Sequence, residues 1–242
     1  MDNQQSGGVT SYIVEGNIGA GKSTFLRLLK EQLGLHIMYE PHDAWQKVGG
    51  EHNLLEAFYK QMPRWAYTFQ SYAFVSRVRA EQKDAAACES PVRIIERSVW
   101  SDRYCFAKNC HESGQMNALE WKLYQEWFSW LMSNYVALPK GFIYLQADPT
   151  VCYQRLKKRN RSEEKEVPIA YLQALHDKHE RWLVSKEGIA PQLADVPVLV
   201  IDANVDFEHD AVARKKVIEA VHTFVLPFAH SKQSFAAVQK NF

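Results

Sequence analysis

The chain has little cysteine, no long apolar run and almost no net charge. Its 242 residues carry a formal net charge of +1, which provides no basic field to attract nucleic acid or a membrane surface. No apolar stretch approaches the length needed to cross a bilayer. Residues 1–9 show neither the apolar core of a signal peptide nor the arginine content of a transit peptide. We therefore expect a cytoplasmic protein with no nucleic-acid or membrane partner.

The four cysteines form no C-x-x-C pair and lack the paired spacing of a zinc site. We interpret them as free thiols in a reducing, intracellular compartment. The hydrophobic fraction of 46% and charged fraction of 24% are ordinary for a soluble globular protein. Because the length suits one α/β domain, we expect a single domain over residues 1–242, without repeats or low-complexity linkers.

A phosphate-binding loop pattern follows the apolar stretch 12–14, and helical spacing continues from it to residue 33. The loop comprises Gly16, Asn17, Ile18, Gly19, Ala20, Gly21, Lys22, Ser23 and Thr24. Its glycines allow backbone N–H groups to turn toward phosphate oxygens. Lys22 adds a positive charge, and the Ser23 hydroxyl can ligate Mg²⁺. An ordinary glycine turn would not need all eight positions of the motif, so the pattern predicts binding of a nucleoside triphosphate.

Hydrophobic periodicity predicts strands that alternate with helices. The expected strands are 12–14, 36–39, 92–95, 141–145 and 198–201. The expected helices are 24–33, 54–84, 117–135, 150–160, 169–184 and 211–225, with Pro63 breaking the second and a new segment starting at residue 64. The alternation predicts an α/β fold with a five-stranded parallel sheet and helices on both faces. We expect the polar tail, about residues 231–242, to be loose.

Three charged residues follow the second and third expected strands. Glu40 ends the second strand, and Glu96 and Arg97 end the third. In parallel sheets, ligands lie outside the carboxyl ends of the strands, where the phosphate-binding loop also lies. A carboxylate in a loop is usually only solvated, but this position favours a functional role for both glutamates.

Several motifs in order resemble the deoxyribonucleoside kinases, in the branch that holds deoxycytidine and deoxyguanosine kinases. They are residues 16–24, Glu40-Pro41 with Trp45, "FYKQMPRWAYTFQSYAFVSRVRA", "ERSVWSDRYCFA", "CYQRLKKRNRSEE" and "YLQALHDKHERWL". The resemblance covers about residues 10–225. It implies a P-loop kinase fold with an arginine-rich lid at about residues 155–166.

The resemblance implies transfer of the γ-phosphate of ATP, or another nucleoside triphosphate, to the 5′-hydroxyl of a deoxyribonucleoside. It makes Glu40 the general base. It also places Glu96 near Mg²⁺ and Arg97 near the transferring phosphate. These roles suit the chemistry, because phosphoryl transfer is catalysed mainly by positioning and charge neutralisation.

The basic run at residues 155–161 would by itself be read as a solvated helix face. The resemblance instead implies a lid whose arginines, Arg155, Arg159 and Arg161, close on the phosphates beside Lys22. It also assigns Glu164 and Tyr59 to the deoxyribose 3′-hydroxyl.

The remaining assignments concern the two bases. By resemblance, Gln70 pairs with the edge of the acceptor base, and Arg77 with Asp102 reads its polar groups. The aromatic walls of the nucleoside pocket are Trp45, Phe69 and Phe106, and Ala73 leaves room for a purine. The segment 202–210, with Asp206 and Phe207, resembles the loop that contacts the donor base. Cytosine, adenine and guanine suit the Arg77–Asp102 pair better than thymine.

Three other functions use a phosphate-binding loop. A nucleoside monophosphate kinase would need a second phosphate-binding set near the acceptor, beyond Arg97. A switch GTPase would carry an Asn-Lys-x-Asp signature, which the chain lacks. A non-catalytic nucleotide sensor would leave Glu40, Arg97 and the lid arginines without a reason.

The expected helix 117–135 carries two neighbouring aromatic stripes. One comprises Trp121, Tyr124, Phe128, Leu131 and Tyr135, and the other comprises Leu123, Trp127 and Trp130. So wide an apolar arc is expected to leave an exposed patch. The resemblance points to a homodimer formed through this region.

Overall fold

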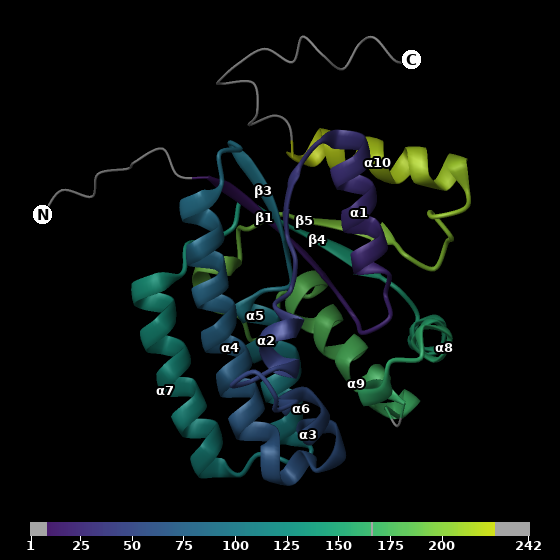
Figure 1. Ribbon diagram of the computed structural model, residues 1–242. Helices are drawn as coiled ribbons and strands as arrows, with labels where there is room; N and C mark the ends of the chain where they lie inside the picture. The colour runs from purple at the N-terminus through teal and green to yellow at the C-terminus, as the bar shows by residue number, and fades with distance from the viewer. Residues whose placement is uncertain (1–8, 166, 226–242) are drawn as a thin grey trace, which may run out of the picture.

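Five parallel strands form a sheet in the order β2-β3-β1-β4-β5. The computed structural model describes residues 9–165 and 167–225, and Figure 1 shows helices on both faces of its sheet. The strands are β1 (Thr10–Gly16), β2 (His36–Met38), β3 (Val92–Glu96), β4 (Gly141–Gln146) and β5 (Val198–Asp202). The predicted α/β fold with a five-stranded parallel sheet is confirmed.

The helical segments connect these strands. They are α1 (Lys22–Leu33), α2 (His42–Gln46), α3 (Leu54–Lys60), α4 (Met62–Ala87), α5 (Val99–Ser101), η1 (Asp102–Ala107), α6 (Lys108–Glu112), α7 (Ala118–Tyr135), α8 (Pro149–Arg159), η2 (Ser162–Glu164), α9 (Ile169–His179), η3 (Glu180–Val184), η4 (Pro191–Leu193) and α10 (Ala211–Val225). Within the described chain, none has the length and hydrophobicity to cross a bilayer.

The central strands are buried on both faces, as parallel strands covered by helices must be. On one face Tyr12 of β1 meets Phe224 of α10, with ring centroids 5.5 Å apart. On the other face Phe142 of β4 meets Trp100 and Trp182, at 5.9 and 5.1 Å. These contacts pack helical segments against both faces of the sheet.

Two local expectations differ from the structure. The break in the second predicted helix falls at Gln61, and Pro63 lies in the first turn of α4. Proline suits that position because the first N–H groups of a helix have no intrahelical partner. The sequence reasoning also missed α2 and the helical stretch from Val99 to Glu112. The predicted tail at 231–242 and the last lid position, 166, lie outside the described residues.

Candidate active site

One cavity of about 590 Å³ lies outside the carboxyl ends of the strands. The residues of the predicted site that line it are Ile18, Gly19, Gly21, Lys22, Ser23, Thr24, Glu40, Trp45, Tyr59, Phe69, Gln70, Ala73, Arg77, Glu96, Arg97, Asp102, Phe106, Arg155, Arg159, Arg161, Glu164, Asp206 and Phe207. The loop residues Gly16, Asn17 and Ala20 are not among the lining residues that the structure describes, and Asn17 and Ala20 are buried. The structure therefore gathers segments from most of the chain around one space.

The phosphate-binding loop joins β1 to α1 in a shape that requires glycine. Gly19 has φ +80°, and a Cβ there would lie 2.4 Å from the carbonyl oxygen of Cys152 in α8. Gly21 is the N-cap residue of α1, with φ 96°, and as a glycine it has no side chain to bond the first N–H groups of the helix. The first N–H groups of α1 therefore face the cavity side of the loop as a potential anion site.

Lys22 spans this loop from the first turn of α1. Its Nζ donates to the carbonyl oxygens of Gly16 and Asn17, at 3.1 and 2.8 Å. Burial lowers the pKa of Lys22 to about 7, and the nearby Arg97 acts in the same direction. A negatively charged ligand on the loop would restore the full charge of the ammonium group.

Three strand ends meet beside the loop. The Ser23 hydroxyl donates to Glu96 Oε1 at 3.4 Å, and the backbone N–H of Glu40 donates to Glu96 Oε2 at 3.3 Å. The expectation that the first three strands present their ends to one crevice is thus confirmed.

The Glu40 carboxylate is almost fully buried and surrounded by donors. Its Oε1 lies 2.7 Å from Arg77 Nη2, and its Oε2 lies 3.1 Å from His42 Nε2 and 3.5 Å from Arg97 Nε. Burial alone would raise the pKa of Glu40, but Arg77, Arg97 and His42 hold it well below its usual value. The carboxylate is therefore ionised at neutral pH and able to accept a proton.

Arg97 holds an unusual backbone conformation next to Glu40. Its φ is +62°, in the left-handed region that side chains rarely adopt. Its N–H donates to Val14 O at 2.9 Å, and its guanidinium lies 4.8 Å from the centre of the Phe106 ring. Nη1 is buried and has no partner within the described residues, so this arginine retains a donor for a ligand.

Two further buried carboxyl groups behave differently from Glu40. Glu15 of β1 accepts a hydrogen bond from Ser98, and burial raises its pKa to about 7. Burial also raises the pKa of Glu81 in α4 to about 7. Neither group has two arginines in ion-pair contact within the described chain, which explains the contrast with Glu40.

Arg77 of α4 contacts both Asp102 and Glu40. Its Nε lies 2.8 Å from Asp102 Oδ2, while Nη2 contacts both Asp102 Oδ1 at 3.0 Å and Glu40 Oε1. Nη1 donates to the Glu96 carbonyl at 3.3 Å. Because an arginine has five N–H donors, one Nη1 hydrogen is left without a described protein partner.

Aromatic side chains line the end of the cavity away from the loop. Phe69 stacks on Phe58 at 4.7 Å, and the Trp45 ring meets Phe69 edge-on at 5.6 Å. Gln70 is buried, with Nε2 lying 3.8 Å from Cys110 Sγ. Flat walls with a buried amide suit a planar ring that has polar edges.

The predicted lid approaches from the opposite side. Arg159 and Arg161 both pair with the buried Glu164, and burial with the Glu164 charge raises the pKa of Tyr59. Arg155 instead donates to the carbonyl oxygens of Ala203 and Ala20, at 2.7 and 3.4 Å. These three arginines thus reach both the phosphate-binding loop and Glu164.

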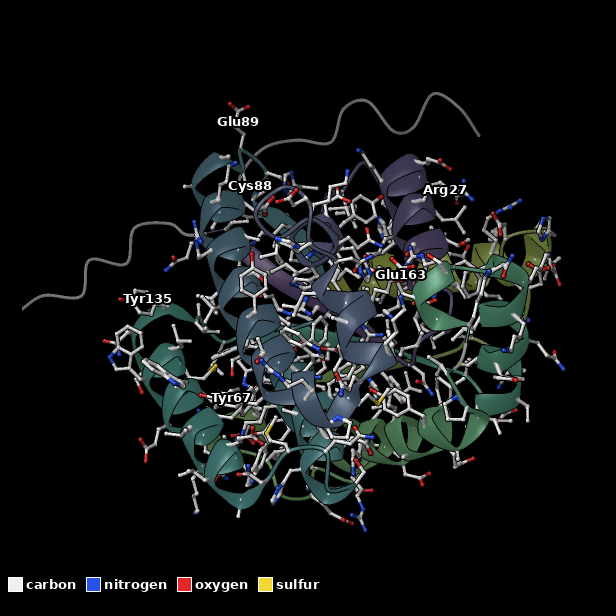
Figure 2. All side chains as sticks on the ribbon, turned by 60° about the horizontal axis from the view of Figure 1, so that its bottom comes forward. Arg27, Tyr67, Cys88, Glu89, Tyr135 and Glu163 are labelled. Atoms are coloured by element: carbon white, nitrogen blue, oxygen red, sulfur yellow. The ribbon has the colours of Figure 1, made fainter. Side chains whose placement is uncertain are left out.

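Glu163, in the predicted lid segment, contacts the end of α2 and the N-cap residue of α3. Its Oε1 accepts from Gln46 Nε2 at 2.6 Å and from Asn53 Nδ2 at 3.3 Å. Figure 2 labels Glu163 near the middle of the view. Sequence reasoning missed these two contacts because partners more than a hundred residues apart leave no local pattern.

The segment after β5 lies against the loop. Phe207 is buried and meets Phe25 of α1 edge-on at 6.0 Å, whereas the exposed Asp206 bonds with His209 within its own turn. Phe207 therefore packs beneath the loop, and Asp206 lies at the rim of the cavity.

Several lining residues were not among the predicted site residues, and two of them, His42 and Tyr171, carry polar groups that bear on the site. His42 contacts Glu40, and its place directly after Glu40-Pro41 was the available signal. Tyr171 of α9 also lines the cavity. Its hydroxyl is buried without a partner among residues 9–165 and 167–225, which only the folded arrangement reveals.

Comparison with known proteins identifies the family. A family model described as deoxynucleoside kinase matches residues 12–226. Deoxycytidine kinase 2 of Gallus gallus is 42% identical, covering 88% of this chain and 89% of the relative. Human deoxycytidine kinase is 41% identical, with 81% and 84% covered, and the mitochondrial deoxyguanosine kinase of Xenopus laevis is 39% identical, with 88% of each chain covered. The family model and these relatives cover most of the chain, so the chain belongs to the deoxynucleoside kinase family.

Proposed function

We propose that this kinase transfers the γ-phosphate of ATP, or another nucleoside triphosphate, to the 5′-hydroxyl of a deoxyribonucleoside. One observation carries the proposal: a single cavity has an anion-binding loop at one end, an aromatic pocket at the other, and an ionised glutamate between them. The reaction forms a bond from the 5′-oxygen to the γ-phosphorus and releases the nucleoside diphosphate. The hydroxyl proton passes to Glu40.

The phosphates of the donor occupy the loop. The free N–H groups at the start of α1 and the Lys22 ammonium group would contact the phosphate oxygens. Phe207 and Asp206 stand at the edge where the donor base leaves the loop. Their lining positions support the proposed contact with that base.

The Ser23 and Glu96 oxygens fit Mg²⁺. They lie 3.4 Å apart at the loop, and hard oxygen ligands are what this ion prefers. Mg²⁺ usually keeps several waters and binds phosphates as well as one or two carboxylates. When bound, Mg²⁺ would neutralise part of the phosphate charge.

Arginines supply the remaining positive charge. Arg97 lies beside Glu40 with one unpaired donor, where the transferring phosphate would pass. Arg155, Arg159 and Arg161 line the same cavity, which supports their proposed role on the phosphates. Charge placed before the reaction stabilises the transition state without reorganisation.

The deoxyribose and its base occupy the aromatic end. Tyr59 and Glu164 line the cavity where the 3′-hydroxyl would lie. We propose that Trp45, Phe69 and Phe106 enclose the base, next to Gln70 and Ala73. The small, buried Ala73 leaves space for the larger ring of a purine.

We propose that deoxycytidine, deoxyadenosine or deoxyguanosine is preferred to thymidine. The free Nη1 hydrogen of Arg77 can donate to a ring nitrogen, while Asp102 accepts from an amino group. Thymine presents an N–H donor between two carbonyl oxygens and leaves part of this buried pair unmatched. Relatives named deoxycytidine kinase and deoxyguanosine kinase support the preference.

We also propose that the enzyme works in the cytoplasm as a homodimer. Its four cysteines are free thiols, as in a reducing compartment. On α7, Leu123, Trp127, Trp130 and Tyr135 are exposed by 39–53%. Figure 2 shows Tyr135 at the margin of the molecule. So large an exposed aromatic patch favours association with a second copy.

The proposed reaction is tested by substituting Glu40, the proposed general base. Glu40→Gln keeps the size of the side chain but cannot take the hydroxyl proton, so kcat should fall ~10²- to 10⁴-fold. A radiolabelled transfer assay measures it, with binding of the triphosphate followed separately and expected to be unchanged. Near-normal kcat in the variant would remove Glu40 from the mechanism.

The base preference is tested by competition between deoxycytidine and thymidine. The double variant Arg77→Met with Asp102→Ala should raise the kcat/KM of thymidine relative to that of deoxycytidine, because the charged pair that disfavours thymine is gone. The ratio is the readout, since losing the Arg77–Glu40 contact slows both substrates alike. An unchanged ratio, or a wild-type preference for thymidine, would refute the assignment.

The dimer is tested by sedimentation equilibrium at micromolar concentration. We expect twice the chain mass of 27.9 kDa, and a lower mass for Trp127→Glu with Trp130→Glu because charge cannot be buried in an aromatic interface. The matched variant Lys83→Glu, on exposed surface of α4, should stay dimeric. A monomeric wild-type protein would contradict the proposal.

A further inference from the structure

His42 is brought against Glu40 by the turn at Pro41. Pro41 has φ −79° and ψ 56°, and the N–H of His42 donates to the carbonyl oxygen of Glu40 at 2.8 Å. This is an inverse γ-turn, which reverses the chain over three residues. The side chains two positions apart are therefore folded onto one another at the start of α2.

The contact joins a ring nitrogen to the ionised carboxylate. His42 Nε2 lies 3.1 Å from Glu40 Oε2. An ionised carboxylate only accepts hydrogen bonds, so at this distance Nε2 is the group placed to donate to Glu40. Nδ1 is buried and has no hydrogen-bond partner in the part of the chain that the structure describes.

The ring itself is held in place from α4. His42 meets the Trp45 ring edge-on, with centroids 5.2 Å apart. Trp45 is buried, and its Nε1 donates to Ser76 Oγ at 2.8 Å. The histidine donor is thus anchored through a buried tryptophan to the helix that also carries Arg77.

The two carboxylate oxygens of Glu40 are not held equally well. Oε1 has a close donor in Arg77 at 2.7 Å, whereas Arg97 reaches Oε2 only at 3.5 Å. His42, at 3.1 Å, is the closer of the two donors on Oε2. Without it, the carboxylate would be free to rotate about the Arg77 contact toward Arg97.

We propose that His42 is a positioning residue for the reaction: it fixes the orientation of the Glu40 carboxylate through Oε2, so that the carboxylate meets the acceptor hydroxyl. The proposal rests on the function proposed above. His42 acts through Glu40 and takes no proton itself. A general base that is misaligned by a fraction of an ångström loses rate because proton transfer needs close, aligned heavy atoms.

The test is a double-mutant cycle between His42→Val and Glu40→Gln, followed by phosphoryl transfer to deoxycytidine. His42→Val in the wild-type background should lower kcat about tenfold, the loss expected for a hydrogen bond to a charged group, with KM changed less than twofold. In the Glu40→Gln background the same substitution should change kcat less than twofold, because there is no longer a base to align.

Two further variants separate positioning from folding. His42→Gln retains an N–H donor at this position and should recover most of the lost kcat. His52→Val makes the same substitution at an exposed histidine between α2 and α3 and should leave kcat unchanged. A fold defect would instead lower kcat by equal factors in both backgrounds of the cycle.

The outcomes are distinct. Wild-type protein that transfers no phosphate to any deoxynucleoside would overturn the proposed function and, with it, the role of His42. Active wild type with unchanged kcat in His42→Val would overturn this inference alone. So would equal losses in the two backgrounds, equal losses in the Val and Gln variants, or a change confined to KM.

Discussion

A carboxylate buried at the centre of the cavity must be matched by donors if it is to stay ionised. Glu40 meets this constraint with Arg77 from α4, Arg97 after β3 and His42 at the start of α2. Each donor comes from a different segment, so the network exists only when the sheet, α4 and the α2 turn are in place. Removing one partner of such a buried set leaves a charge unpaired, which is strongly destabilising.

The same network links Glu40 to Asp102 through Arg77. Arg77 contacts Glu40 and Asp102 with one guanidinium group, so the proposed base-reading residue and the proposed general base share a partner. A nucleoside base that draws on Arg77 would alter the charge felt by Glu40. Glu163, in the predicted lid segment, accepts from Gln46 at the end of α2 and from Asn53.

The parts of this arrangement that depend on local pattern could be predicted. The phosphate-binding loop, the five strands and the exposed stripe of Trp127 and Trp130 follow from short spacings in the chain. The helical stretch from Val99 to Glu112 was missed; part of it, η1, is π-helical, which disturbs the usual helical spacing. Contacts such as Glu163–Gln46 join residues distant in sequence, and the His42–Glu40 contact depends on a turn conformation. Neither leaves a periodic signal.

The central claim, that Glu40 is held ionised by its donors, is tested most directly by ¹³C NMR of the glutamate carboxyl groups in the free protein. Glutamate to glutamine variants assign the resonances of Glu40, Glu15 and Glu81. The account predicts that Glu40 shows no titration between pH 5 and 8, because its pKa lies well below the usual value. Glu15 and Glu81, with pKa values of about 7, should titrate in that window. A Glu40 resonance that titrates alongside them would contradict the account.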